Sequence, residues 1–238
     1  MNASLKILCA ATAAFAAASS QAQTFYGYDP SMADLTNHNT AKASFIAAAG
    51  SVSTLDFESV AVGAQSNSPI SFGSFTGSLT TGTGPGVAEA DVRDSSIYGA
   101  SAFSGTHFFL GLGSAGETLL TVHLDQAVKS VGFSLSDEAD FGQSSNPGHE
   151  LVLGNGEVYS LTPNIPYDHP DGNAAFFGVV SATTFDTFSI RYPSNGFGTG
   201  TDADAVGIDD IVVAAPVPEP ATLAVLGLGL VTVRRRKR

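Results

Sequence analysis

The sequence predicts an all-β fold: a jelly-roll-like β-sandwich of about eleven strands, with one short N-terminal α-helix and a C-terminal hydrophobic helix. Short apolar segments recur from residue 52 onwards, separated by turns rich in Gly, Ser, Thr, Asn and Pro. Within residues 118–124, Leu120, Val122 and Leu124 fall on one face, which is the alternation of a half-buried strand. Recurring short strands without intervening helices favour a sandwich or barrel over βαβ units.

The expected strands all lie between such turn signals. They span residues 52–57, 70–75, 87–92, 107–112, 118–124, 128–135, 150–153, 158–161, 174–180, 184–192 and 206–213. Residues 23–38 are expected to be irregular, and long polar loops are expected at 137–148 and 194–204. The sequence shows no internal repeat and no second boundary, so residues 23–213 are interpreted as a single β-sandwich domain.

One α-helix is expected over residues 40–49, a segment rich in good helix formers. Asn39 can cap its N-terminus and Gly50 can end it. Its apolar stripe consists of Ala41, Phe45, Ala48 and Ala49. We expect this stripe to lie against an edge of the sheet or to close one end of the sandwich.

The first 22 residues have the pattern of a signal peptide. Lys6 precedes an apolar stretch at residues 7–18, and small residues follow it at the positions that a signal peptidase requires. We expect cleavage after Ala22, with Ala18 and Gln23 as alternative sites. The apolar stretch is too short to favour a permanent membrane anchor.

The other end of the chain, residues 214–238, has three parts in a fixed order. A motif comes first, formed by Val217, Pro218, Glu219 and Pro220. An uncharged apolar run at residues 221–233 follows, and the chain ends on the basic residues Arg234, Arg235, Arg236, Lys237 and Arg238. At ~1.5 Å per residue the run gives a helix of about 20 Å, shorter than a ~30 Å hydrocarbon core. The basic residues favour a cytoplasmic C-terminus, so the pattern predicts a marginal membrane span.

This tail closely resembles the PEP-CTERM sorting signal, which is also catalogued as the C-terminal domain of ice-binding proteins. The resemblance implies a secreted protein of a Gram-negative bacterium, held transiently in the inner membrane and cut near the Pro-Glu-Pro motif by an exosortase. It also implies a role linked to exopolysaccharide and biofilm production at the cell surface.

Charge and cysteine content exclude several classes of function. Residues 23–215 hold 21 acidic and four basic residues, a net charge of −17. Nucleic acid and anionic lipid surfaces are therefore improbable partners, whereas cations, neutral polysaccharide and basic surfaces remain candidates. Cys9 is the only cysteine and lies in the expected signal peptide, so the mature chain has neither disulfides nor a thiol nucleophile.

Four acids form the candidate metal site. Asp56 and Glu58 lie on the first expected strand, and Asp209 and Asp210 lie on the last. The pattern resembles carbohydrate-binding-module-like jelly rolls, in which such acids flank a structural calcium, and this resemblance implies a Ca²⁺ site. Carboxylate oxygens suit Ca²⁺, although strand alternation would send Asp209 and Asp210 to opposite faces. The alternative is that these acids face solvent along an edge strand.

Two adjacent aromatic pairs and three tyrosines are candidates for a sugar-binding face, and core packing is the favoured alternative. These residues are Phe108, Phe109, Phe176, Phe177, Tyr159, Tyr167 and Tyr192. No HExxH or Gly-x-Ser-x-Gly motif is present.

Together these observations predict a secreted, surface-sorted, non-enzymatic β-sandwich protein that is a structural or polysaccharide-binding component of the matrix. One alternative is a polysaccharide hydrolase or lyase using acids such as Glu138, Glu150 or Asp171. A weaker alternative is adhesion to ice or mineral, because the sequence contains no Thr-x-Thr array of repeating period.

Overall fold

The computed structural model describes residues 21–83, 87–113, 116–137, 149–161, 172–192 and 205–214. The expected signal peptide up to residue 20 and the tail beyond Ala214 lie outside these residues. Among the described residues, none of the helical structure is long and apolar enough to cross a membrane.

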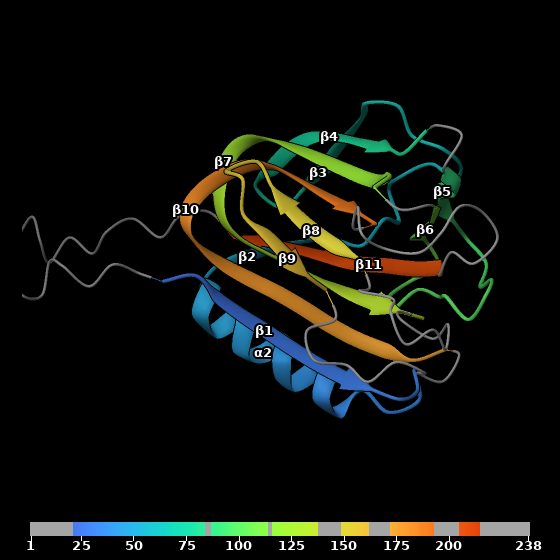
Figure 1. The fold of residues 1–238 in the computed structure, drawn as a ribbon, viewed down its shortest axis with the longest axis horizontal. Coiled ribbons are helices and arrows are strands. Elements are labelled where there is room, and N and C mark those ends of the chain that lie inside the picture. The colour runs from blue at the N-terminus through green and yellow to red at the C-terminus, as the bar shows by residue number, and fades with distance from the viewer. Residues whose placement is uncertain are drawn as a thin grey trace, which may run out of the picture.

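Eleven antiparallel strands and one helix make up the described fold (Figure 1). In chain order these are β1 (Gln23–Asp29), α2 (Thr36–Ala49), β2 (Val52–Leu55), β3 (Ser68–Phe72), β4 (Phe75–Thr81), β5 (Val87–Arg93), β6 (Phe108–Gly113), β7 (Thr118–Ser136), β8 (Glu150–Leu153), β9 (Val158–Ser160), β10 (Ala174–Arg191) and β11 (Ala205–Ala214).

Two long strands, β7 and β10, pass through both layers of the sandwich. In one layer the C-terminal half of β7 pairs with the N-terminal half of β10 around Val131 and Val179. There β1 pairs with the other edge of β10, and β11 pairs with the other edge of β7. In the second layer the N-terminal half of β7 pairs with the C-terminal half of β10 around Val122 and Phe188. There β4 pairs with β7, and β8 pairs with β10. The register of β10 shifts between Val180 and Phe185, where the strand bends from one layer to the other. One continuous sheet thus folds into two facing layers, as the all-β prediction requires.

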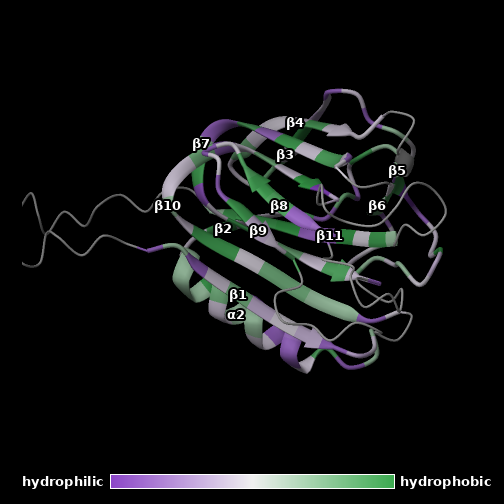
Figure 2. Ribbon diagram, in the orientation of Figure 1, coloured by the Kyte–Doolittle hydropathy of each residue, from purple (hydrophilic) through white to green (hydrophobic). Residues whose placement is uncertain are grey.

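The main core lies between the two layers. Leu120, Phe133, Phe177, Phe188 and Ile208 are among its fully buried side chains, and they come from both halves of the long strands and from β11. Figure 2 shows the resulting alternation of apolar and polar residues along the strands.

Helix α2 covers the outer face of the layer that contains β1 (Figure 1). Phe45, fully buried, sits over Gly178 of β10 and Gly132 of β7, which lie opposite each other in the sheet. A Cβ atom at Gly178 would lie 2.6 Å from the Phe45 ring, and one at Gly132 would lie 3.2 Å from it. The two glycines therefore form a socket, which Phe176 closes at a ring distance of 5.6 Å.

The helix differs from its prediction at its start and along its stripe. It begins at Thr36, and the carboxylate of Asp29 at the end of β1 accepts the backbone N–H groups of Asn37 (3.1 Å) and His38 (2.8 Å). The expected cap Asn39 lies inside the helix. Ala48 is exposed, so the buried stripe is narrower than expected.

The strand count agrees with the prediction, but the strands are not the same eleven. Residues 118–135 form one bent strand, as do residues 174–191, where two strands each were expected. The expected strand 70–75 is divided between two strands: residues 70–72 end β3, residues 73 and 74 form the hairpin turn, and Phe75 begins β4. Residues 23–29 form β1, although they were expected to be irregular.

Candidate functional site

Asp209 and Asp210 lie at an irregularity in β11. The pairing of β11 with β7 shifts between Asp209 and Val212, and Asp210 has a φ of 50°. A residue in this left-handed region interrupts the alternation of the strand. The expectation that the two side chains point to opposite faces is therefore wrong, because both contact Ser104.

These two acids hold a segment that we call the strap, residues 101–107, which leads into β6. One oxygen of Asp209, Oδ2, accepts the backbone N–H groups of Phe103 (2.8 Å) and Ser104 (2.9 Å). The Ser104 hydroxyl donates to Asp210 Oδ1 at 2.7 Å. Ser136 Oγ accepts the N–H of Ser101 and donates to its carbonyl oxygen. The strap is thus held mainly by side chains of β11 and β7.

Glu58 holds the other end of the strap. Its Oε1 accepts the backbone N–H groups of Thr106 and His107, each at 2.6 Å. These two hydrogen bonds stabilise the carboxylate and lower the pKa of Glu58. Asp56, exposed, accepts the N–H of Glu58 at 3.3 Å and does not contact the strap in the described structure.

Burial dominates the electrostatics of Asp209. Its side chain is fully buried, and the loss of solvent raises its pKa to about 6, although the N–H groups of Ser104, Asp210 and Phe103 oppose that shift. Asp210 forms an ion pair with Lys42 of α2 at 2.7 Å. The two neighbours therefore differ: one is a buried acceptor of N–H groups, and the other is half of an ion pair.

His38 of α2 and Ser134 of β7 form a hydrogen bond beneath the strap. His38 Nε2 lies 2.9 Å from Ser134 Oγ, and the imidazole stacks on the ring of Phe103 at 4.8 Å. Burial lowers the pKa of His38. Ser134 is fully buried, so a substrate cannot reach its hydroxyl. This pair fixes α2 and the strap on the sheet.

The structure thus brings Glu58, Asp209 and Asp210 to one segment of chain, as acceptors of its hydrogen bonds. Within the described part of the chain, no group of three or more His, Cys, Asp or Glu side chains is arranged to hold a metal ion. The calcium site stays a prediction.

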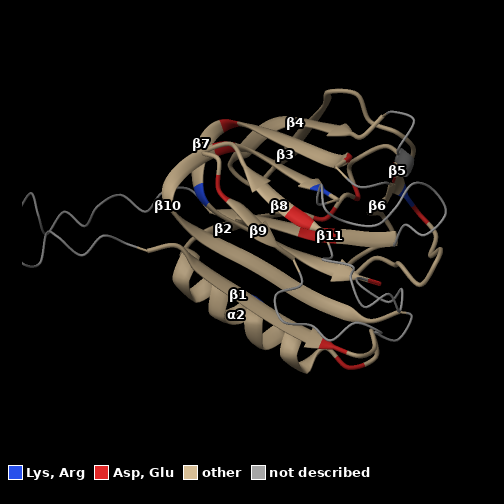
Figure 3. Ribbon diagram, viewed as in Figure 1, with Lys and Arg blue, Asp and Glu red and all other residues tan. Residues whose placement is uncertain are grey.

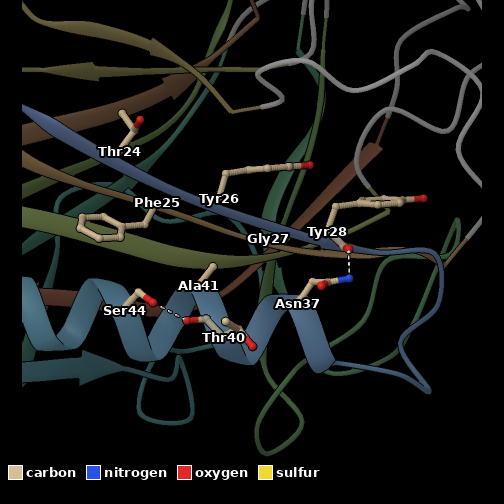
Figure 4. A pocket seen from close by; sticks show the side chains of 9 residues that line it. All are labelled: Thr24, Phe25, Tyr26, Gly27, Tyr28, Asn37, Thr40, Ala41 and Ser44. Carbon is tan, nitrogen blue, oxygen red and sulfur yellow. Dashed lines mark hydrogen bonds between the residues drawn. The ribbon is translucent and has the colours of Figure 1, made fainter.

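A shallow groove of about 480 Å³ runs between β1 and α2 (Figure 4). Its walls are residues 24–28 of β1 and Asn37, Thr40, Ala41 and Ser44 of α2. The helix approaches β1 closely because Gly27 has no side chain, and a Cβ atom there would collide with the carbonyl oxygen of Asn37.

The groove presents neutral hydrogen-bonding groups. Thr40 and Ser44 are exposed, and their hydroxyls donate to helix carbonyl oxygens at 2.8 and 2.9 Å, which leaves their oxygens able to accept. Asn37 Nδ2 donates to the carbonyl oxygen of Tyr28 at 3.0 Å. None of the lining residues carries a charge. Such a surface can hydrogen-bond uncharged polar ligands.

The aromatic candidates pack in the core, as favoured. Both rings of each adjacent pair are buried: Phe109 and Phe177 face the main core, Phe108 packs beside the strap, and Phe176 lies under α2. Tyr192 is buried and Tyr159 is partly buried against the core, while Tyr167 lies outside the described residues. Of the acids considered for hydrolysis, Glu150 pairs with Arg191 at 2.9 Å, and Glu138 and Asp171 lie outside the described residues.

Comparison with protein families decides the nature of the tail. Residues 216–238 match the family model described as the PEP-CTERM protein-sorting motif. The chain carries a PEP-CTERM tail. The PEP-CTERM tail implies export to the cell envelope or surface of a Gram-negative bacterium and processing by an exosortase. Its four motif residues, Val217 to Pro220, and its basic end lie outside the described residues.

Comparison of the chain with curated proteins and with solved structures does not identify the β-sandwich domain. No curated protein matches the chain. One solved structure that is similar is described as the K2 cleaved adhesin domain of Lys-gingipain, with 12% sequence identity and a TM-score of 0.43. The match covers 70% of this chain and 99% of that one.

Sequence reasoning missed the groove and the strap. Residues 23–38 contain no strong alternation, so neither β1 nor the early start of α2 was expected. The one available signal was Gly27 between two tyrosines, a position where a backbone can approach closely.

Proposed function

We propose that the domain is a non-enzymatic surface module that binds neutral polysaccharide of the extracellular matrix or biofilm through the groove between β1 and α2. The observation that carries this proposal is the groove itself, which is lined by uncharged hydrogen-bonding groups in a protein with a sorting tail. Its volume of about 480 Å³ lies within the range of about 300–1,000 Å³ that is usual for small-ligand sites.

Charge supports a neutral ligand over an acidic one. Residues 23–215 carry a net charge of −17, which repels polyanions at low ionic strength. The groove adds no cation to offset that repulsion. Hydroxyl and amide groups, by contrast, exchange hydrogen bonds with sugar hydroxyls.

The test is retention of the processed protein on immobilised neutral glucan and on alginate as the acidic comparison. We expect retention on the neutral polymer alone. The double variant Thr40→Val with Ser44→Ala removes the two exposed hydroxyls of α2 that line the groove. It should weaken binding about tenfold, because each lost hydrogen bond is worth ~0.5–1.5 kcal/mol. Thr54→Val, on the exposed side of β2 and outside the groove, is the matched control. Equal retention of the double variant and the control would refute the groove as the site.

A further inference from the structure

Lys42 of α2 and Asp210 of β11 form an ion pair that links the helix to the last strand of the domain. Lys42 Nζ lies 2.7 Å from Asp210 Oδ2, and only 22% of the lysine side chain and 13% of the aspartate side chain are exposed. The two residues are 168 positions apart in the chain. A primary amine is therefore held against a carboxyl group at a place that admits little water.

The amine distinguishes this pair from other ion pairs of the described chain. Figure 3 shows how few cations stand among the acids. Arg93 and Arg191 form their ion pairs through guanidinium groups, which stay protonated. A lysine amine, by contrast, becomes a nucleophile once it gives up a proton. Lys42 therefore presents to its partner carboxylate a group that can react with it.

The Asp210 carboxylate is fixed by different partners at its two oxygens. The Ser104 hydroxyl donates to Oδ1 at 2.7 Å, and the Lys42 amine contacts Oδ2. The left-handed backbone of Asp210, with a φ of 50°, directs the side chain towards α2 and the strap, and its N–H donates to Asp209 Oδ1 at 2.7 Å. Such backbone strain in a residue other than glycine is common at functional sites. Oδ1 is thus placed to remain as a carbonyl oxygen with a hydrogen-bond donor, while Oδ2 faces the amine.

Packing keeps the two groups at this separation. Ala41 and Phe45 of α2 share one buried cluster with Val212 of β11. Lys42 and Asp210 each lie within three residues of that cluster, so helix and strand cannot move the amine away from the carboxylate. Well-oriented groups within one molecule reach effective concentrations of ~10⁵–10⁸ M, which favours their condensation.

We propose that Lys42 and Asp210 are a modification site, at which an intramolecular isopeptide bond joins α2 to β11. Lys42 Nζ forms a bond with Cγ of Asp210, and the bond between Cγ and Oδ2 breaks. Two of the three ammonium protons leave with Oδ2 as water, and the third stays on the amide nitrogen. The Ser104 hydroxyl stabilises the negative charge that develops on Oδ1 when Cγ is attacked. The condensation needs no oxidant and no co-reactant.

The bond closes a covalent loop from residue 42 to residue 210, which contains most of the domain. Such a loop restricts the unfolded chain, as disulfides do in many exported proteins. Residues 23–215 contain no cysteine, so an amide is a cross-link that this domain can form where a disulfide is impossible. The proposal does not depend on what the groove between β1 and α2 binds.

The test is the mass of the folded full-length chain, purified in detergent, and of its tryptic peptides. We expect the chain to be lighter than its sequence by one water molecule. Trypsin should not cut after Lys42, because an acylated lysine carries no charge, and the peptide around Lys42 should be branched to residues 192–234, which contain Asp210. Lys42→Arg is the matched control: it keeps a positive charge beside Asp210 but cannot form this amide, so it should have its full mass.

A second measurement is the mobility of the boiled chain in SDS gels, where the wild-type protein should migrate faster than Lys42→Arg because the bond keeps the denatured chain compact. Ser104→Ala should lower the rate of cross-linking after synthesis at least about tenfold. An unchanged rate would overturn the part assigned to Ser104. Full mass with cleavage after Lys42 in the folded wild-type protein would overturn the proposal and leave a salt bridge. A loss of water that persists in Lys42→Arg would overturn it as well, since it would arise elsewhere in the chain.

Discussion

Asp209 and Asp210 are neighbours in a strand, yet both carboxylates contact Ser104, one through the backbone N–H and the other through the hydroxyl. Regular alternation would separate them by the thickness of the sheet. The irregularity at Asp210 brings the two carboxylates to the same side of the sheet. Strand β11 therefore holds the strap through Asp209, and Asp210 also forms an ion pair with Lys42 of α2. Helix, strap and central strand are therefore joined at one point.

Loss of the Asp209 carboxylate should destabilise the fold. Asp209→Ala leaves the N–H groups of Phe103 and Ser104 without their acceptor, and we expect the free energy of unfolding to fall by about 2–4 kcal/mol at pH 7. Asp209→Asn retains an acceptor oxygen and should lose less. Urea unfolding of the two variants measures the difference. Equal losses would show that an acceptor oxygen at position 209 does not account for the stabilisation.

The raised pKa of Asp209 predicts a particular pH dependence. Its value is about 6 in the folded protein and about 3.9 in an unfolded chain, so the folded state binds the proton more tightly. The associated stability is present below about pH 4 and is lost as the pH rises through about 6. Relative to Asp209→Asn, the wild-type protein should lose about 2–3 kcal/mol between pH 4 and pH 7. A constant difference between the two proteins over this range would contradict the burial of a titrating carboxyl group.

The socket for Phe45 should tolerate no side chain at its floor. Gly178→Ala places a Cβ atom 2.6 Å from the ring, and we expect a loss of about 1–3 kcal/mol from overpacking. Phe45→Leu frees space, so the double variant should be more stable than the sum of the single losses predicts. A double-mutant cycle by urea unfolding tests this coupling, and strict additivity would mean that the ring does not occupy the socket.

A calcium site and the observed hydrogen bonds of the strap predict opposite responses of the Tm to Ca²⁺. Oε1 of Glu58 and Oδ2 of Asp209 each already accept two backbone N–H groups. We therefore expect the same Tm in EDTA and in millimolar Ca²⁺. A rise in Tm with Ca²⁺ that disappears in Asp209→Ala would establish the ion site and displace the strap interpretation.

The sequence predicted the class of fold because alternation and turn signals are local properties. It did not reveal that residues 118–135 and 174–191 are single bent strands, since a bend between two layers interrupts the alternation in the same way as a turn does. Apart from Gly27 it contained no sign of β1, whose place depends on pairing with Val180, Phe177 and other residues far along the chain.

The candidate site was predictable only in part. Of the four acids of the predicted metal site, Glu58, Asp209 and Asp210 contact the strap and Asp56 does not, and the metal site itself stays a prediction. The N–H and hydroxyl groups of the strap that these acids accept have no signature in a sequence. The groove depends on how closely α2 approaches Gly27, and this is a tertiary property.

Binding in the groove is the central claim, and amide NMR of the processed protein tests it most directly. Titration with a neutral glucan oligosaccharide should shift the resonances of Thr24, Asn37, Thr40 and Ser44 and leave those of Phe103 and Ser104 in the strap unchanged. The Thr40→Val, Ser44→Ala variant should need about tenfold more oligosaccharide for the same shifts. Absence of any shift, or shifts confined to the strap, would contradict the account.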